Sequence, residues 1–309
     1  MALENGSLVT EFVLLGLTDQ PELQVPLFFL FLAMYLITSL VNLALIILII
    51  LNSHLHTPMY FFLVNLSFID LCYSSVLTPK MLMNFILRKN IISYMGCMTQ
   101  VYFFSLFAIS ECFVLTSMAY DRYVAICNPL LYNTVMSPKV CSYLMLGTYL
   151  MGLTGAMFHT GCLLGLTFCD GNIINHYFCD LLPLFQLSCT STYVNEVELL
   201  IAGAKDIIVP SVIIFTSYGF ILSRILQTRS TEGRSKAFST CSSHLVAVSL
   251  FFGSSGFMYL QPSSAGSRDG GKISSIFYTT VVPMMNPLIY SLRNKDIKIA
   301  LRKTLRKIL

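Results

Sequence analysis

The sequence predicts an all-α membrane protein, a bundle of seven transmembrane helices followed by a short amphipathic eighth helix. Of its 309 residues, 55% are hydrophobic and only 11% are charged, whereas soluble domains carry about 25% charged residues. Seven apolar runs are each long enough to cross a bilayer as a helix, and a basic stretch with helical periodicity ends the chain. A net charge of +4 gives no reason to expect a nucleic-acid partner.

The apolar runs divide the chain into three parts. We expect an extracellular tail over residues 1–24, a transmembrane bundle over 25–292, and a cytoplasmic amphipathic helix and tail over 293–309. The seven predicted spans are Val25–Leu51, Pro58–Leu87, Cys97–Cys127, Val140–Leu166, Glu196–Leu226, Lys236–Leu260 and Lys272–Leu292. The third run is longer than the hydrocarbon core requires, so it should tilt or project beyond the lipid.

The last predicted helix should lie on the membrane surface. Its apolar residues recur at helical spacing between lysines and arginines: Ile297, Ala300, Leu301, Leu305 and Ile308. This pattern is typical of a helix that binds anionic lipid at the cytoplasmic face.

The distribution of basic residues orients the bundle. The amino terminus lacks a basic segment and is a poor cleavable signal peptide, so the first run should act as an uncleaved anchor. With that terminus outside, the inner segments hold thirteen lysines and arginines and the outer segments five, as the positive-inside rule requires. The sequon at Asn5 predicts glycosylation of an extracellular tail.

Several motifs are spread over nearly the whole chain. They are "LHTPMYFFLVNLSFID" from Leu55, "MAYDRYVAICNPLLY" from Met118, "SY" at Ser217, "KAFSTCSSHL" from Lys236 and "PMMNPLIYSLRN" from Pro283. In this order they resemble the rhodopsin-like G-protein-coupled receptors, and more closely the olfactory receptors of the tetrapod-type class. The resemblance implies a plasma-membrane receptor, in olfactory cilia, that binds a small volatile odorant and activates a heterotrimeric stimulatory G protein, raising cAMP.

Three positions depart from the family pattern. Val41 stands where a glycine is usual, Phe252 replaces a tyrosine, and Gln261 replaces an arginine. We expect these changes to affect tuning or basal activity rather than the class of protein.

The resemblance implies a ligand pocket in the outer half of the bundle. Counted by helical steps from Cys97, Pro210, Gly253 and Pro287, its residues are Phe104, Ser105, Ala108, Ile109, Cys112, Ala202, Gly203, Asp206, Ile207, Ser255, Gly256, Tyr259, Ile276 and Thr279. Asp206 is the one acidic residue in this set, so it should select ligands by charge and hydrogen bonding. We therefore expect a neutral odorant with a hydrogen-bond donor rather than a carboxylic acid. Alternatively, Asp206 pairs with Lys205 and only shapes the bundle.

Two further acids lie within spans. Asp70 and Glu111 cannot both remain ionised in a low dielectric without a cation or a shared proton. The resemblance places them with Asn42 and Asn286 around a sodium pocket. The alternative is a protonated, hydrogen-bonded pair that braces the helices.

The cytoplasmic ends of the helices should form the G-protein switch. The resemblance assigns it Asp121, Arg122, Tyr123, Tyr218, Lys236, His244 and Tyr290. We expect Arg122 to pair with Asp121 at rest and to turn toward Tyr218 on activation. His244 should form a latch to the third helix, and Lys236 should contact the G protein or serve only the positive-inside rule. A solvated charge pair at the membrane edge is the alternative for Asp121 and Arg122.

Four cysteines face the oxidising outer side. The resemblance implies disulfides Cys97–Cys179 and Cys169–Cys189, although spacing alone leaves the connectivity open. A zinc site that includes His176 has atypical ligand spacing. We expect the other cysteines to be small buried hydrophobic residues.

Other classes of protein fit the sequence less well. Neither a nucleophile elbow nor an HExxH motif supports an enzyme, and His159 suits a core position with its hydrogen bonds satisfied. A secondary transporter would show repeated halves. A receptor for a non-odorant ligand such as an amine would place an acid in "VYFFSLFAIS", which holds none.

Overall fold

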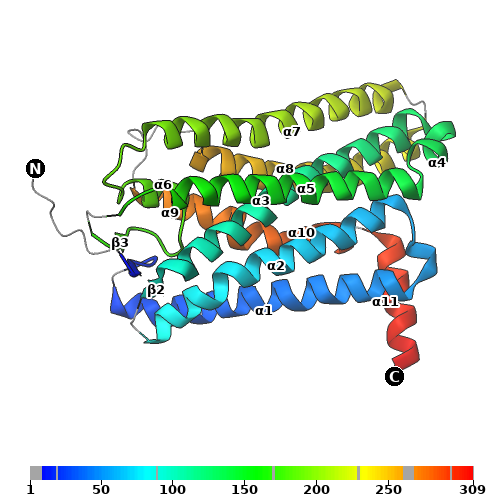
Figure 1. The fold of residues 1–309 in the computed structure, drawn as a ribbon. Coiled ribbons are helices and arrows are strands. Elements are labelled where there is room, and N and C mark those ends of the chain that lie inside the picture. The colour runs from blue at the N-terminus through cyan, green and yellow to red at the C-terminus, as the bar shows by residue number, and fades with distance from the viewer. Residues whose placement is uncertain are drawn as a thin grey trace, which may run out of the picture.

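The computed structural model shows long helices packed side by side (Figure 1). It describes residues 9–18, 20–87, 90–168, 171–227, 230–259, 268–292 and 294–308. Short strands lie at one end of the bundle, and α4 (Tyr132–Val135) and α11 (Lys295–Ile308) lie at the other. From the orientation of the chain, the strands mark the extracellular end.

Six helices of the described chain are long and apolar enough to cross a membrane. They are α1 (Pro21–Leu51), α2 (Pro58–Leu87), α3 (Tyr94–Cys127), α5 (Pro138–Leu164), α7 (Tyr193–Gln227) and α8 (Thr231–Tyr259). The seventh crossing consists of three consecutive pieces: α9 (Arg268–Ile276), the π-helix η3 (Phe277–Val281) and α10 (Val282–Leu292). The seven-helix bundle and its eighth helix are therefore confirmed.

Local signals set the helix ends. Pro21 and Pro138 occupy first-turn positions of α1 and α5, where the fixed φ of proline suits a helix and its missing N–H costs nothing. The Ser93 side chain accepts a hydrogen bond from the Gly96 N–H and caps α3. Because hydropathy does not register these caps, the predicted spans begin two to four residues inside the observed helices at these three ends.

Helix α3 is the centre of the bundle and packs against α2, α5, α7 and α8. A glycine allows its close contact with α5. A Cβ atom at Gly152 would lie 2.6 Å from the Leu106 carbonyl oxygen, so any side chain there would push the two helices apart.

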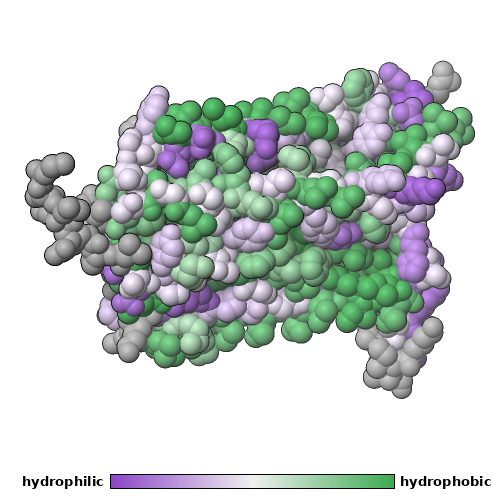
Figure 2. Space-filling model, in the orientation of Figure 1, coloured by the Kyte–Doolittle hydropathy of each residue, from purple (hydrophilic) through white to green (hydrophobic). Residues whose placement is uncertain are grey.

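The outer surface of the bundle suits lipid. Figure 2 shows apolar side chains over much of the flanks of the long helices, with hydrophilic ones near α4 and α11 and in smaller patches along the flanks. Large apolar side chains such as Leu40, Phe215 and Ile201 are exposed, as expected where hydrocarbon rather than water is the solvent.

Helix α11 runs across the cytoplasmic end of the bundle (Figure 1). Ile297 and Ala300 are buried, whereas Leu301 is exposed. The Tyr60 hydroxyl of α2 donates to Asn294 Oδ1 over 3.1 Å, immediately before α11 begins. The helix is thus fixed to the bundle by part of the apolar stripe that its sequence predicts.

A three-stranded sheet covers the extracellular end. Strand β1 (Glu11–Leu14) lies between β2 (Ile91–Ser93), to which it is antiparallel, and β3 (Ile173–Ile174), to which it is parallel. Phe12 and Leu14 are fully buried, so this part of the expected amino-terminal tail belongs to the folded molecule.

Candidate ligand-binding site and cytoplasmic switch

A cavity opens between the outer halves of the helices. It contains about 620 Å³ of empty space, a figure that includes the solvent at its open side. Its lining comprises Tyr73, Phe104, Ser105, Ala108, Ile109, Cys112, His159, Leu181, Leu199, Gly203, Asp206, Ile207, Phe251, Ser255, Tyr259 and Tyr278. Most of these side chains are apolar, as expected of a site for a hydrophobic ligand.

Ten of the predicted pocket residues line this cavity. The structure brings together Phe104, Ser105, Ala108, Ile109, Cys112, Gly203, Asp206, Ile207, Ser255 and Tyr259. Four predicted residues do not line it: Ala202, Gly256, Ile276 and Thr279. Six lining residues were missed: Tyr73, His159, Leu181, Leu199, Phe251 and Tyr278.

The π-helix explains the error on the seventh crossing. Counting back from Pro287 in steps of 3.6 residues assigns Ile276 and Thr279 to the cavity. In η3 the hydrogen bonds run from residue i to i+5, which accommodates an extra residue and rotates the helix above it. Tyr278 therefore lines the cavity, and Thr279 Oγ1 lies 2.9 Å from the Tyr177 hydroxyl instead.

Asp206 faces the cavity and also contacts its neighbour. The Lys205 ammonium lies 3.2 Å from Asp206 Oδ1, with the lysine side chain 52% exposed and the aspartate side chain 8% exposed. Apart from this ion pair, Oδ1 has no hydrogen-bond partner. Asp206 thus lines the cavity and pairs with Lys205 at the same time, so the two roles predicted as alternatives occur together.

His159 is buried, as expected of a core histidine, and it also lines the cavity. Its ring packs against Phe158. The hydropathy of α5 could not reveal the contact with the cavity, because only the packing of α5 against α3 decides which face is internal.

The extracellular loop after α5 forms the outer wall of the cavity. Cys179 is joined to Cys97 by a disulfide bond, which confirms that predicted pair. Cys189 is also disulfide-bonded, whereas Cys169 and the glycosylation site Asn5 lie outside the described residues. Leu181, in the short helix α6 (Leu181–Phe185), lines the cavity.

Asp180 is a buried acid in this wall. One carboxylate oxygen accepts hydrogen bonds from the Leu181 N–H over 2.8 Å and from the Tyr259 hydroxyl over 3.0 Å. Burial disfavours the charged form and raises the pKa of Asp180 to about 6, although both hydrogen bonds act in the opposite direction. This contact connects the loop to the cavity through Tyr259.

The zinc alternative for His176 has no support. The His176 ring stacks on Tyr177 and meets the edge of Phe178, and burial lowers its pKa to about 3. Cys179 and Cys189 are both held in disulfides. Among the described residues, no group of three or more histidine, cysteine or acidic side chains could hold a metal.

Deeper in the bundle, Asn286 joins the two buried acids. Its Nδ2 donates to both Asp70 oxygens over 3.2 Å and to Glu111 Oε1 over 3.1 Å. Asn42 instead donates to the Pro283 carbonyl over 3.1 Å. Three of the four predicted residues therefore form one hydrogen-bonded cluster, and Asn42 fixes α1 to α10.

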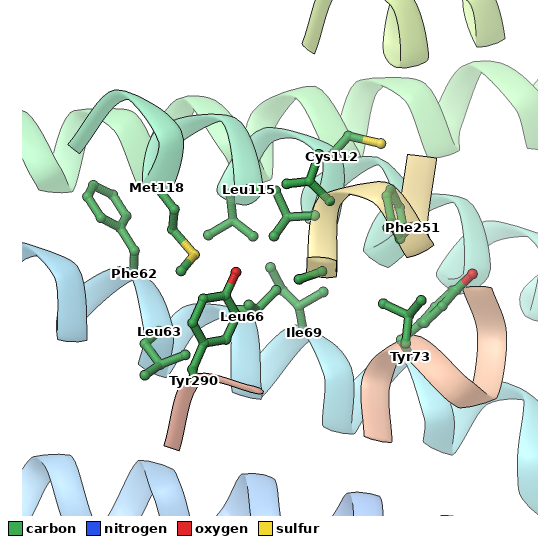
Figure 3. Close-up of a cluster of buried hydrophobic side chains, with 14 of the residues drawn as sticks. Phe62, Leu63, Leu66, Ile69, Tyr73, Cys112, Leu115, Met118, Phe251 and Tyr290 are labelled. Atoms are coloured by element: carbon green, nitrogen blue, oxygen red, sulfur yellow. The ribbon is translucent and has the colours of Figure 1, made fainter. Parts of the chain in front are cut away.

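Apolar side chains separate the cavity from the cytoplasmic switch. Figure 3 shows this cluster along α2 and α3, with Tyr73 and Phe251 at one end and Phe62 and Tyr290 at the other. Cys112 lies between the two ends on α3. Because Tyr73, Cys112 and Phe251 also line the cavity, a ligand that moved them would press directly on this cluster.

The predicted pair Asp121–Arg122 is absent from the ion pairs of the described residues. Asp121 accepts a hydrogen bond from the Tyr132 hydroxyl over 2.8 Å. An Arg122 guanidinium nitrogen lies 3.9 Å from the Met59 sulfur, and Nε has no partner. Adjacent helical residues point about 100° apart, so Asp121 can reach the following loop while Arg122 faces the bundle.

His244 is held by the fifth crossing, α7. The Tyr218 hydroxyl lies 2.7 Å from His244 Nδ1, and the rings stack. The imidazole also lies near the Leu115 backbone of α3, although Nε2 has no hydrogen-bond partner. Tyr290 packs near the same ring. Tyr123 packs on Phe220 instead, and the side chain of Lys236 lies outside the description.

The fold and these sites define a seven-helix receptor with an outer cavity and a cytoplasmic switch. The family model for the olfactory receptor matches residues 31–307. The chain is 70% identical to olfactory receptor 8B3 of Homo sapiens over 308 residues, covering 100% of this chain and 98% of that protein. It is 66% identical to olfactory receptor 8B8 of Homo sapiens over 307 residues, covering 99% of each chain.

A mouse protein is also similar. Olfactory receptor 8B3 of Mus musculus is 68% identical over 303 residues, which cover 98% of this chain and 95% of that protein. The chain therefore belongs to the olfactory receptor family of G-protein-coupled receptors. It is a multi-pass protein of the plasma membrane and an odorant receptor, not an enzyme.

Proposed function

We propose that this receptor binds a small, mostly apolar volatile in the cavity between α3, α7 and α8, and that binding activates a stimulatory G protein and raises cAMP. The cavity itself carries this proposal, since its apolar lining holds only a few polar groups. The apolar cluster between the cavity and the switch supplies a continuous packed route from ligand to cytoplasm.

A glycine offers a direct test of the cavity. Nothing lies within 4 Å of the position that a Cβ would occupy at Gly203, and Gly203 lines the cavity. Gly203→Leu should therefore fill ligand space, with no clash at Cβ, and abolish odorant-evoked cAMP at normal surface density. Gly161→Leu is the matched control, because Gly161 is exposed, equally open and outside the lining.

The ligand is a neutral odorant with a hydrogen-bond donor rather than a carboxylic acid. Among the described residues of the lining Asp206 is the single acid, and a carboxylate ligand would repel it in a low dielectric. Panels of matched alcohols, aldehydes, amines and acids should show altered tuning in Asp206→Leu, and in Asp206→Asn chiefly for amines and acids, because the amide loses the charge and keeps a hydrogen-bond acceptor. Identical tuning in wild type and both variants, at matched surface levels, would remove Asp206 from the site.

A sodium ion belongs to the same proposal. Hard cations take oxygen ligands, and the cluster of Asp70, Glu111 and Asn286 has two buried oxygens without partners, Glu111 Oε2 and Asn286 Oδ1. Asp70, Glu111 and Asn286 would hold the ion, which would neutralise the paired carboxylates. The alternative is a protonated brace, which the bridging Asn286 amide also suits.

A further inference from the structure

Two buried polar atoms of the cavity residues lack hydrogen-bond partners. They are Tyr73 Oη on α2 and Asp206 Oδ1 on α7, whose contact within the protein is the ion pair with Lys205. Both helices pack against α3, and Figure 1 shows them on opposite sides of it. Tyr73 and Asp206 therefore belong to different walls of one cavity.

The other hydroxyls of the lining differ from Tyr73. The Tyr259 hydroxyl donates to Asp180 and lies 3.3 Å from the Tyr278 hydroxyl. Ser255 Oγ donates to the Phe251 carbonyl. Of the three tyrosines around the cavity, Tyr73 is thus the one with an unpaired hydroxyl among the described residues. Native structures rarely leave a buried polar atom unpaired, so the Tyr73 hydroxyl is available to a polar group of a ligand.

Both groups are held in place without a ligand. The Tyr73 ring stacks on Phe104, with centroids 5.6 Å apart and an angle of 29° between the planes. The ion pair with Lys205 fixes Asp206. Polar groups that are already held in place and can still form a hydrogen bond are well suited to recognise a ligand, because binding then costs little ordering entropy.

We propose that this cavity selects odorants with a hydrogen-bonding group at each end, the best match being a neutral aliphatic hydroxy ketone. Its hydroxyl donates to Asp206, whose carboxyl oxygen accepts in either protonation state. Its carbonyl accepts from the Tyr73 hydroxyl. The saturated chain between them lies against Phe104, Cys112 and Phe251. This inference rests on the proposed odorant function and adds the class of ligand.

Matched variants separate the two ends. Tyr73→Phe deletes the hydroxyl and keeps the ring that stacks on Phe104. Asp206→Leu deletes the acceptor, whereas Asp206→Asn keeps one. Tyr35→Phe is the control for loss of a tyrosine hydroxyl, because Tyr35 pairs with Ser75 and lies outside the cavity lining.

The test measures cAMP dose responses in cells with verified surface receptor. The probes are a homologous series of hydroxy ketones, the ketones that lack the hydroxyl, and the alcohols that lack the carbonyl. In wild type, the best hydroxy ketone should act at about tenfold lower concentration than either one-ended analogue, as expected for one satisfied buried polar group.

The variants should remove this preference one end at a time. In Tyr73→Phe the hydroxy ketone should lose its higher potency relative to the alcohol and keep its higher potency relative to the ketone. In Asp206→Leu it should keep the former and lose the latter. Asp206→Asn and Tyr35→Phe should retain both advantages. Equal potency of one-ended and two-ended probes in wild type, or an equal loss for all probes in Tyr73→Phe, would overturn two-ended selection while leaving odorant reception intact. A surface-displayed wild type that answers no probe would count against both proposals.

Discussion

Replacing Asp180 should change how receptor stability depends on pH. This carboxyl is fully buried, and its pKa is raised from an ordinary value of 3.8 to about 6. The folded state therefore binds more protons than the unfolded state between these two values, so stability falls as pH rises through this range. The Asp180→Asn substitution puts a neutral amide in place of the carboxyl, so this stretch of the wall would no longer titrate.

The size of the effect follows from the shift. Each pKa unit is worth about 1.4 kcal/mol, so the whole shift is worth about 3 kcal/mol, of which about 1.4 kcal/mol is lost between pH 5 and pH 7.5. Purified wild type should melt a few degrees higher at pH 5 than at pH 7.5, once the response of a control variant is subtracted. The Asp180→Asn variant should show a clearly smaller change over the same interval.

Thermal unfolding of the detergent-solubilised receptor, followed by intrinsic tyrosine fluorescence, measures this difference. Glu11→Gln is a suitable control, because Glu11 is an exposed acid at the same extracellular end. Subtracting the control removes the general response of the protein to acid. If Asp180→Asn kept the full pH dependence of wild type, Asp180 would not be the titrating group, and the argument from its burial would fail.

Four further outcomes test other parts of the structure. Gly152→Ala should lower surface expression, because its Cβ would meet the backbone of α3, whereas Gly147→Ala, with open space around it, should not. Arg122→Ala should abolish evoked cAMP at matched surface density; normal signalling would refute the switch. His244→Ala should change basal cAMP several-fold, since it leaves its tyrosine partner unpaired at a cost of about 1–3 kcal/mol; unchanged basal and evoked signals would exclude the latch. Replacing sodium by choline should alter odorant potency in wild type but not in Glu111→Gln, and an equal effect in both would favour the protonated brace.

The sequence predicts the long helices well because each carries its own hydropathy signal. It also locates cavity residues on α3 and α7, where regular helical steps hold from Cys97 and from Pro210. Counting helical steps from Pro287 gives the wrong face at Thr279. The residues "FYTTV" carry no sequence signal for the i to i+5 hydrogen bonds of η3.

Residues such as Tyr73 and His159 were missed for a different reason. Each lies in a long apolar helix, and only the packing of neighbouring helices decides whether a side chain faces lipid, core or cavity. The partner of Asp121 was missed likewise, because Tyr132 approaches it from a separate short helix. Strand β1 has only four residues, and its pairing depends on segments far along the chain.

The position of β1 between β2 and β3 has a consequence for biosynthesis. Val13 pairs with Ile91 and with Ile173, so the first strand to be synthesised receives its last partner only after four membrane-spanning helices have been made. Until then Phe12 and Leu14 have no complete apolar site to enter. Exposure of Phe12 and Leu14 therefore distinguishes a receptor whose first half is unassembled from one in which the outer sheet has formed. Quality control in the endoplasmic reticulum acts on such exposed apolar side chains.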